Sequence, residues 1–193
     1  MKTRKLLFVA ALLTFTIIAC KEEETKFGAS ISPIQNVVNS LPVSMGYFRD
    51  EPTIMATQFK SFKDGRITEF GIRAGKGTYT VSLWDSSAQS IISSTTITAT
   101  DSTVFKYKDI SDINIVSNKT YIISMFNQIA EGGSGTQVFR YGITGFPFTQ
   151  GDIIIFGSYY KNTPNATAFP ANNFNLNTEL INGIADFKFE PKL

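Results

Sequence analysis

Apolar and polar residues alternate in parts of this chain with the period of two that a β-strand imposes. Residues 78–83 place Tyr79, Val81 and Leu83 on one face and hydroxyl side chains on the other. Residues 185–190 alternate in the same way. Because successive side chains of a strand point to opposite faces, this pattern predicts strands with one buried face.

Further short apolar stretches follow one another from Met45 onward, separated by Gly, Asn, Asp, Ser and Pro, and no long segment has a helical period. This spacing is typical of all-β sandwiches and barrels. We therefore predict one antiparallel β-sandwich, jelly-roll or immunoglobulin-like. The predicted strands are residues 54–62, 66–73, 78–84, 90–98, 104–110, 120–127, 138–144, 152–160 and 185–190.

Local features refine this prediction. The Asp64-Gly65 pair predicts a hairpin between the first two strands, since glycine adopts the positive φ of a tight turn. The apolar positions of 66–73 change phase, which predicts a bulge near Thr68. Residues 121–123 and 153–156 are apolar on both faces, which favours central strands or strands under a covering loop.

The first twenty residues have a different pattern. Met1 to Lys5 carry three positive charges, and the apolar run 6–18 is interrupted only by Thr14 and Thr16. This is the layout of a secretory signal. The run is shorter than the ~20 residues that a membrane-spanning helix needs, so a permanent transmembrane helix is the weaker interpretation.

The signal ends at Ile17-Ile18-Ala19-Cys20, which resembles the bacterial lipobox, and Cys20 is the only cysteine of the chain. The resemblance implies that residues 1–19 are removed and that Cys20 is acylated, which anchors the protein to a membrane. The alternative is an ordinary signal followed by a free cysteine. With one cysteine, the chain has no intramolecular disulfide.

The next four residues, Lys21, Glu22, Glu23 and Glu24, look like the acidic export signal of Bacteroidetes-type surface lipoproteins. That resemblance implies display at the cell surface from the outer membrane. The alternatives are a solvated linker and a periplasm-facing protein. Residues 25–41 show no sustained period, so residues 20–41 are predicted to be a flexible tether and the folded domain to comprise residues 42–193.

The amino-acid composition makes some classes of function unexpected. Removal of three of the 18 basic residues leaves 15 against 16 acidic ones, so the mature chain is nearly neutral. A neutral surface lacks the field that attracts phosphates, and nucleic acid is not expected as a partner. The chain contains no histidine, so the commonest general base and metal ligand is missing. We predict a protein that is not an enzyme and has no cofactor.

Four short motifs, taken in their order along the chain, form a larger pattern. They read D-G-R-I at 64–67, G-T-Y-T-V-S-L-W-D at 77–85, N-K-T-Y-I-I-S at 118–124 and A-D-F-K-F at 185–189. The order resembles that of a family of uncharacterised bacterial extracellular β-sandwich modules with a G-T-x-x-x-x-L-W-D motif. The resemblance covers about residues 45–191 and implies a binding or spacing role, and no catalytic residue carries over.

Aromatic and amide side chains provide the candidate ligand site. Alternation directs Trp84 to the face opposite Leu83, where it would either stack on a sugar or cover a core. The aperiodic stretch 161–183 is rich in asparagine and is interpreted either as a sugar-contacting loop or as a covering loop whose asparagines bond to its own backbone. The candidate ligand-binding residues are Trp84, Phe169, Asn172, Asn173, Phe174 and Asn175.

Two other patterns have structural interpretations. Asp101, Asp109 and Asp112 carry oxygens suited to calcium, but they lack a loop signature and are better explained as turn caps. The glycine-rich residues 131–135 lack the lysine of a phosphate-binding loop and predict a turn.

We therefore predict an envelope-anchored, non-catalytic β-sandwich lipoprotein that binds an extracellular glycan or another envelope component. The first alternative is an assembly or adhesion subunit that contacts other surface proteins. The second is a glycoside hydrolase based on two carboxylates. The spacing of Asp and Glu residues in the sequence does not identify such a pair.

Overall fold

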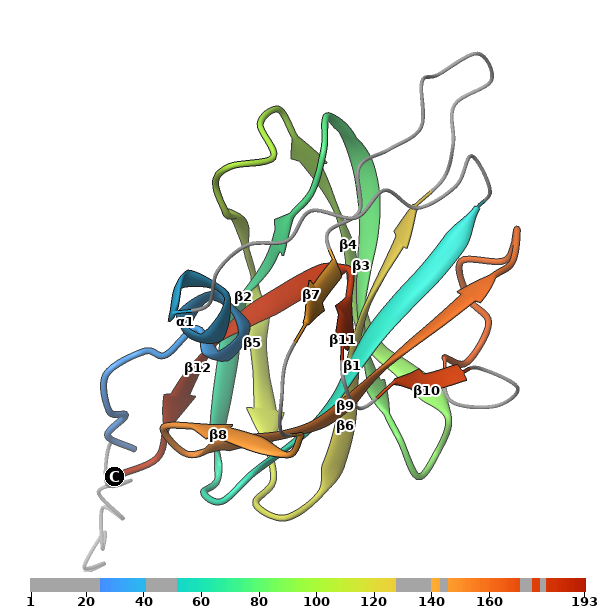
Figure 1. Ribbon diagram of the computed structural model, residues 1–193. Coiled ribbons are helices and arrows are strands. Elements are labelled where there is room, and N and C mark those ends of the chain that lie inside the picture. Colours follow the sequence, from blue (N-terminus) through green and yellow to red (C-terminus); the bar gives the residue numbers. More distant parts are fainter. Residues whose placement is uncertain (1–24, 41–51, 128–139, 143–145, 171–174, 178–179) are drawn as a thin grey trace, which may run out of the picture.

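Two antiparallel β-sheets pack against each other in the computed structural model, which describes residues 25–40, 52–127, 140–142, 146–170, 175–177 and 180–193 (Figure 1). The elements are α1 (Pro33–Ser40), β1 (Thr53–Ser61), β2 (Gly65–Arg73), β3 (Gly77–Asp85), β4 (Ser90–Ala99), β5 (Lys106–Ile115), β6 (Thr120–Asn127), β7 (Arg140–Gly142), β8 (Phe148–Gln150), β9 (Ile153–Asn162), β10 (Asn175–Asn177), β11 (Leu180–Asn182) and β12 (Ile184–Pro191).

The large sheet has the strand order β10-β9-β1-β6-β3-β4, with β8 also paired to β9. The small sheet has the order β12-β2-β5, and β11 pairs with β7 separately. All named pairs are antiparallel. The predicted all-β antiparallel sandwich is confirmed.

The main core fills the space between the two sheets. Tyr79, Val81 and Leu83 of β3 are fully buried there, as the alternation predicts. From the small sheet, Phe187 of β12 reaches across to Phe59 of β1, and their ring centroids lie 4.4 Å apart. Such close contact of large apolar side chains supplies most of the stabilisation of a sandwich.

Each of the nine predicted strands is present, although some bounds move by several residues. The strands β8, β10 and β11 were not predicted, because three residues are too few to show a period. The predicted bulge is also present. Relative to β12, Thr68 is the extra residue, because Ile67 pairs with Phe189 and Glu69 pairs with the adjacent Lys188. The register with β5 also shifts between Ile67 and Glu69, but there the additional residues lie on β5.

The hairpin predicted at Asp64-Gly65 is wrong. Strand β1 lies in the large sheet and β2 in the small sheet, so the connection crosses between the sheets. Gly65 does not have a positive φ. Its conformation is set by close packing, because a Cβ atom there would collide with the Glu190 carbonyl and lie 2.5 Å from the Phe189 ring. An Asp-Gly pair can occur in a hairpin within one sheet or in a connection between two sheets. The pairing of the flanking strands determines which of the two forms.

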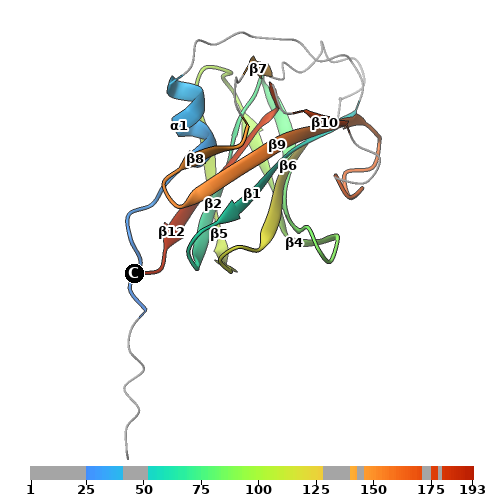
Figure 2. The same cartoon turned by 60° about the horizontal axis from the view of Figure 1, so that its bottom comes forward.

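The segment predicted as a flexible tether is largely part of the fold. Phe27 and Ile31 form β-bridges with Lys192 and Phe189 along the edge of β12. Helix α1 then buries Ile34, Val37 and Val38 in the main core, beside β12 (Figures 1 and 2). The described part of the folded unit therefore already includes residues 25–40, and the predicted start at Pro42 lies outside the described residues. A helix of eight residues is too short to produce a clear stripe in the sequence.

The two ends of the described chain meet at one end of the sandwich. The backbone N–H of Gly28 donates to the Pro191 carbonyl at 2.8 Å, and that of Leu193 donates to the Lys26 carbonyl at 3.0 Å. We call this end, seen at the bottom of Figure 1, the terminal end. It consists of residues 25–28, 62–64, 86–89, 116–119, 151–152 and 192–193.

Within the described part of the chain, no helix has the length and apolar character required to cross a membrane.

Candidate functional site

The outer face of the large sheet carries a row of hydroxyl side chains on β3 and β4. Their positions follow from register, since Thr78, Thr80 and Ser82 pair directly with Thr98, Thr96 and Ser94. Oγ1 of Thr78 lies 3.0 Å from Oγ1 of Thr98, and Oγ of Ser82 lies 2.9 Å from Oγ of Ser94. Four of the six side chains are exposed. We call this set the hydroxyl ladder: Thr78, Thr80, Ser82, Ser94, Thr96 and Thr98.

A second hydrophobic cluster continues the same face toward β6, β1 and β9. It consists of Ile54, Ala56, Trp84, Ile122, Phe126 and Tyr159, and we call it the outer cluster. Trp84 is only 2% exposed, and its Nε1–H donates to Oγ of Ser124 at 2.8 Å. The indole lies opposite Leu83, as predicted, but it is buried and cannot itself stack on a sugar.

Residues of the 161–183 stretch lie over the outer cluster. Ala166 and Phe169 pack against it, and the Phe169 ring meets Trp84 edge to face with centroids 5.8 Å apart. In this connection Oδ1 of Asn165 accepts from the backbone N–H and the hydroxyl of Thr167. The described part of the stretch therefore has the properties of a covering loop, while Phe169 stays half-buried.

The remaining predicted ligand residues are only partly placed. Asn175 begins β10, where its backbone pairs with Tyr160 of β9. Asn172, Asn173 and Phe174 lie outside the described residues, as do Cys20, Lys21, Glu22, Glu23, Glu24 and the glycine-rich residues 131–135.

The hydroxyl ladder was not predicted from the sequence, although its pattern is present there. Thr78, Thr80 and Ser82 were assigned to one face of a strand, and residues 94–98 repeat hydroxyl side chains at every second position. Cross-strand pairing of the two rows is visible only in the tertiary structure.

Burial limits the acid–base chemistry of this face. Burial raises the pKa of Tyr159, whose hydroxyl donates to Oε1 of Gln58 at 3.3 Å. The ladder itself consists of neutral hydroxyl groups, which donate and accept hydrogen bonds without changing charge. The face is therefore suited to recognition rather than to proton transfer.

A different polar cluster lies beneath α1. The carboxylate of Asp186 accepts hydrogen bonds from the backbone N–H groups of Ile34 and Gln35 at 3.1 and 2.9 Å and from the Tyr107 hydroxyl at 2.7 Å. These N–H groups belong to the first turn of α1, so Asp186 acts as its N-terminal cap from 151 and 152 residues away in sequence.

Burial has a strong effect on this cluster. It raises the pKa of Asp186 to about 6, against the lowering effect of the hydrogen bonds from Tyr107 and α1. Burial, followed by the nearby Asp186 charge, also raises the pKa of Tyr107. Asp186 is completely enclosed, so the group with the most perturbed carboxyl pKa has no access to a ligand. Its role is structural.

Two of the three aspartates that were weighed as calcium ligands have other partners in the structure. Asp101 accepts from the backbone N–H and the hydroxyl of Thr103, which lowers its pKa and makes it a turn cap. Asp112 pairs with Arg66 at 2.6 Å. No group of three or more Cys, Asp or Glu side chains within the described ranges is arranged to hold a metal ion.

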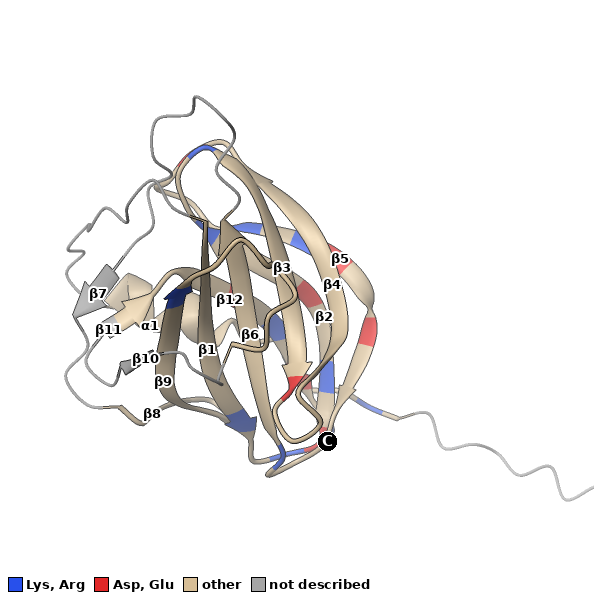
Figure 3. Cartoon of the chain, turned by 90° about the vertical axis from the view of Figure 1, so that its right-hand side faces the viewer, with Lys and Arg blue, Asp and Glu red and all other residues tan. Residues whose placement is uncertain are grey.

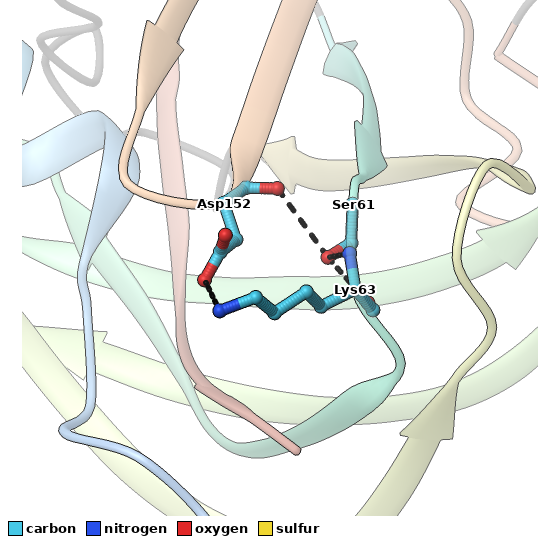
Figure 4. Close-up of polar contacts among 3 residues, drawn as sticks. All are labelled: Ser61, Lys63 and Asp152. Atoms are coloured by element: carbon cyan, nitrogen blue, oxygen red, sulfur yellow. Dashed lines mark hydrogen bonds and ion pairs between the residues drawn. The ribbon is translucent and has the colours of Figure 1, made fainter. Parts of the chain in front are cut away.

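Ser61, Lys63 and Asp152 form a polar contact at the terminal end (Figure 4). Oγ of Ser61 donates to the Lys63 carbonyl at 2.6 Å, and the Lys63 ammonium lies 3.5 Å from the Asp152 carboxylate. The lysine is thus directed to the aspartate and not to the serine hydroxyl. The contact joins the β1–β2 connection to the turn before β9 and does not activate a nucleophile.

A polar hollow of about 300 Å³ also lies at the terminal end, lined by Thr25, Phe27, Asp64, Gly65, Asn114 and Lys192. A backbone hydrogen bond from Ser117, with a smaller contribution from Lys192, lowers the pKa of Asp64. Beside the hollow, the Arg66 guanidinium lies 4.1 Å from the centroid of the Phe27 ring.

Comparison of the chain with family models, with curated proteins and with solved structures found no match.

Proposed function

We propose that this chain is a lipid-anchored, non-catalytic β-sandwich protein of the bacterial envelope that binds an extracellular glycan on the outer face of its large sheet. The signal segment and the lipobox ending at Cys20 support export and anchoring. The acidic run after Cys20 favours the outer surface of the outer membrane, and the order of the motifs supports an extracellular module.

The observation that carries the glycan assignment is the hydroxyl ladder lying directly beside the outer cluster. Ser82 and Trp84 are successive outward positions of β3, so the polar and aromatic parts of the face adjoin. Paired hydroxyls of the ladder lie 3.0 and 2.9 Å apart across the strands, and successive outward positions along one strand are about 7 Å apart. Such a grid can contact several hydroxyls of one saccharide.

The exposed ladder hydroxyls of Thr78, Ser94, Thr96 and Thr98 can make further hydrogen bonds, since a hydroxyl has one donor and two acceptor positions. The half-buried Phe169 provides an apolar edge next to the ladder, which suits the C–H face of a sugar ring. Alternating hydroxyl and C–H groups on a saccharide therefore match the two parts of this face.

The carboxylates of the described residues support binding over hydrolysis. Glu69, Asp85 and Asp152 pair with Lys188, Lys119 and Lys63, and both Asp112 and Glu190 pair with Arg66. Asp186 is enclosed. A glycoside hydrolase needs one carboxyl group held protonated and a second free to act on the sugar, and these paired or enclosed carboxylates do not meet that requirement.

The edge strands of the small sheet are poorly suited to pairing with a strand of another protein. This favours a glycan as the ligand. The edge strand β5 carries charged residues at Lys106, Lys108, Asp109 and Asp112, which discourage pairing with another chain. The edge of β12 is covered by the bridges of Phe27 and Ile31. Figure 3 shows basic and acidic residues intermixed on the side that it displays, which also supports the expectation that nucleic acid is not a partner.

A glycan array tests the proposal, with the chain from Thr25 to Leu193 so that α1 is retained. The double variant Thr96→Val, Thr98→Val removes two exposed ladder hydroxyls and keeps the shape of the side chains. Thr149→Val, at an exposed position of β8 away from the ladder, is the matched control.

Saturable binding that is lost in the double variant and retained in the control supports the proposed site. Equal binding by both variants would place any glycan elsewhere on the protein. Absence of binding across a broad array overturns the glycan assignment and favours the assembly or adhesion subunit.

A further inference from the structure

The fold begins much closer to the lipobox than the sequence predicts. Thr25 is already placed in the structure, and the Phe27 bridge to Lys192 holds the chain to the terminal end. Four residues lie between Cys20 and Thr25, so the five steps from one Cα atom to the other span at most about 18 Å even when fully extended. An acylated Cys20 would therefore hold the terminal end next to the lipid surface.

The terminal end also exposes large apolar side chains. Phe62 is 51% exposed, Val116 54% and Leu193 77%. Among the described residues, the other exposed large hydrophobic side chains are Ile92 and Val104. Val104 precedes β5, whose first residue pairs with Ile72 near the end of β2, so it lies at the opposite end of the sandwich.

Hydrogen bonds hold the three segments that carry these side chains in fixed positions. The N–H of Phe62 donates to the Asp152 carbonyl at 2.8 Å. The N–H groups of Asn118 and Lys192 donate to the carbonyls of Ser61 and Asp64, both at 2.7 Å. The apolar side chains are thus presented by a firmly connected set of loops.

Charges at the terminal end nearly balance once the adjoining Asp85 is counted, because four lysines then stand against three aspartates. Lys63 pairs with Asp152, and Lys119 lies 2.6 Å from Asp85. Lys192 lies close enough to Asp64 to lower the pKa of that carboxyl. The end therefore offers no strong attraction to anionic lipids, and its apolar side chains are the feature suited to a membrane interface.

We propose that the terminal end lies against the lipid surface in which Cys20 is anchored, with Phe62, Val116 and Leu193 at the level of the headgroups. This inference rests on the lipid anchor of the proposed function. It places the hydroxyl ladder on a side of the sandwich rather than under it, so the ladder remains accessible.

Fluorescence of the full-length, acylated protein in vesicles of phosphatidylethanolamine and phosphatidylglycerol tests the contact. Acylation consumes the only natural thiol, so a cysteine introduced at one position takes up an environment-sensitive label there alone. Val116→Cys carries the label at the terminal end. Val104→Cys is the matched control, a valine of similar exposure at the opposite end.

The label at position 116 is expected to shift to shorter wavelength and to be quenched at least about threefold less by aqueous iodide than the label at 104. The added substitution Phe62→Ser should reduce this protection. The protection should change little with the fraction of phosphatidylglycerol, because the charges balance.

Flotation with the vesicles separates the two proposals. A protein that does not float has no lipid anchor, which overturns the proposed anchoring and this inference together. A protein that floats with equal quenching at 116 and 104 overturns the contact alone. Protection at 116 that grows with the protein-to-lipid ratio indicates contact between copies of the chain and also overturns it. Circular dichroism of each variant establishes that it is folded.

Discussion

The Tyr107 hydroxyl donates a 2.7 Å hydrogen bond to Oδ2 of Asp186 across the full width of the small sheet. The two residues are on the outer strands β5 and β12, and both pair with Gly71 of the central strand β2. Because Gly71 has no side chain, the Tyr107 ring can lie over it and reach the carboxylate. A glycine in the middle of a strand is thus required by a polar contact between its neighbours.

Gly71→Ala is expected to destabilise the protein by about 2 kcal/mol or more, because a Cβ atom there would collide with the Tyr107 ring and displace it from Asp186. Gly77→Ala is the control, since its nearest neighbour, the Tyr79 ring, would be 3.5 Å away. Urea unfolding of both variants measures the difference. Equal stability of the two would show that the ring moves aside without cost.

Stability should depend on pH through Asp186. Burial raises the pKa of this carboxyl in the folded protein to about 6 from an ordinary value of 3.8, so the folded state binds the proton more tightly than the unfolded state. The free energy of unfolding is therefore expected to fall by about 2 kcal/mol as the pH rises from 4 to 7.

Asp186→Asn should remove this slope, and Asp85→Asn, which changes a carboxyl whose pKa is lowered by Lys119, should leave it in place. The aspartates with lowered pKa values affect stability below their ordinary pKa, in a separate range of pH. Urea unfolding at several pH values provides the measurement. A slope that persists in Asp186→Asn would contradict the assignment.

Ile34→Ala tests whether α1 is part of the fold. Ile34 is fully buried in the main core, so its truncation is expected to cost about 2–4 kcal/mol of stability. Asn36→Ala, on the exposed side of the same helix, should change the free energy of unfolding by less than about 0.5 kcal/mol. Similar small effects at both positions would indicate that residues 25–40 behave as the flexible tether that the sequence predicts.

Trp84 is the only tryptophan and reports on the loop above it. Phe169→Ala removes the ring that packs edge to face on Trp84 and should shift its emission to longer wavelength, increase its quenching by acrylamide, and cost about 1–3 kcal/mol. Phe62→Ala, at an exposed position of the terminal end, should leave the Trp84 emission unchanged. Unaltered emission in Phe169→Ala would show that other residues cover the indole.

The positions of the longer strands, and the buried face of two of them, could be predicted from the sequence. The side-chain period of a strand is a local property, and it identified the inward face of residues 78–83 and of the last strand, as well as the bulge at Thr68. Local alternation also placed Trp84 on the face opposite Leu83. What it could not show was that the residues around Phe169 would cover that face.

Local sequence patterns were sufficient to predict an all-β sandwich with nine of its strands, the lipobox at Cys20 and the candidate aromatic and amide residues. The placement of β1 and β2 in different sheets, the inclusion of residues 25–40 in the fold and the burial of Asp186 became visible only in three dimensions. The partners of these groups lie far away in the chain, as Asp186 and Ile34 do. A local pattern carries no information about a contact across such a separation, because the contact depends on which strands pair and what then covers them.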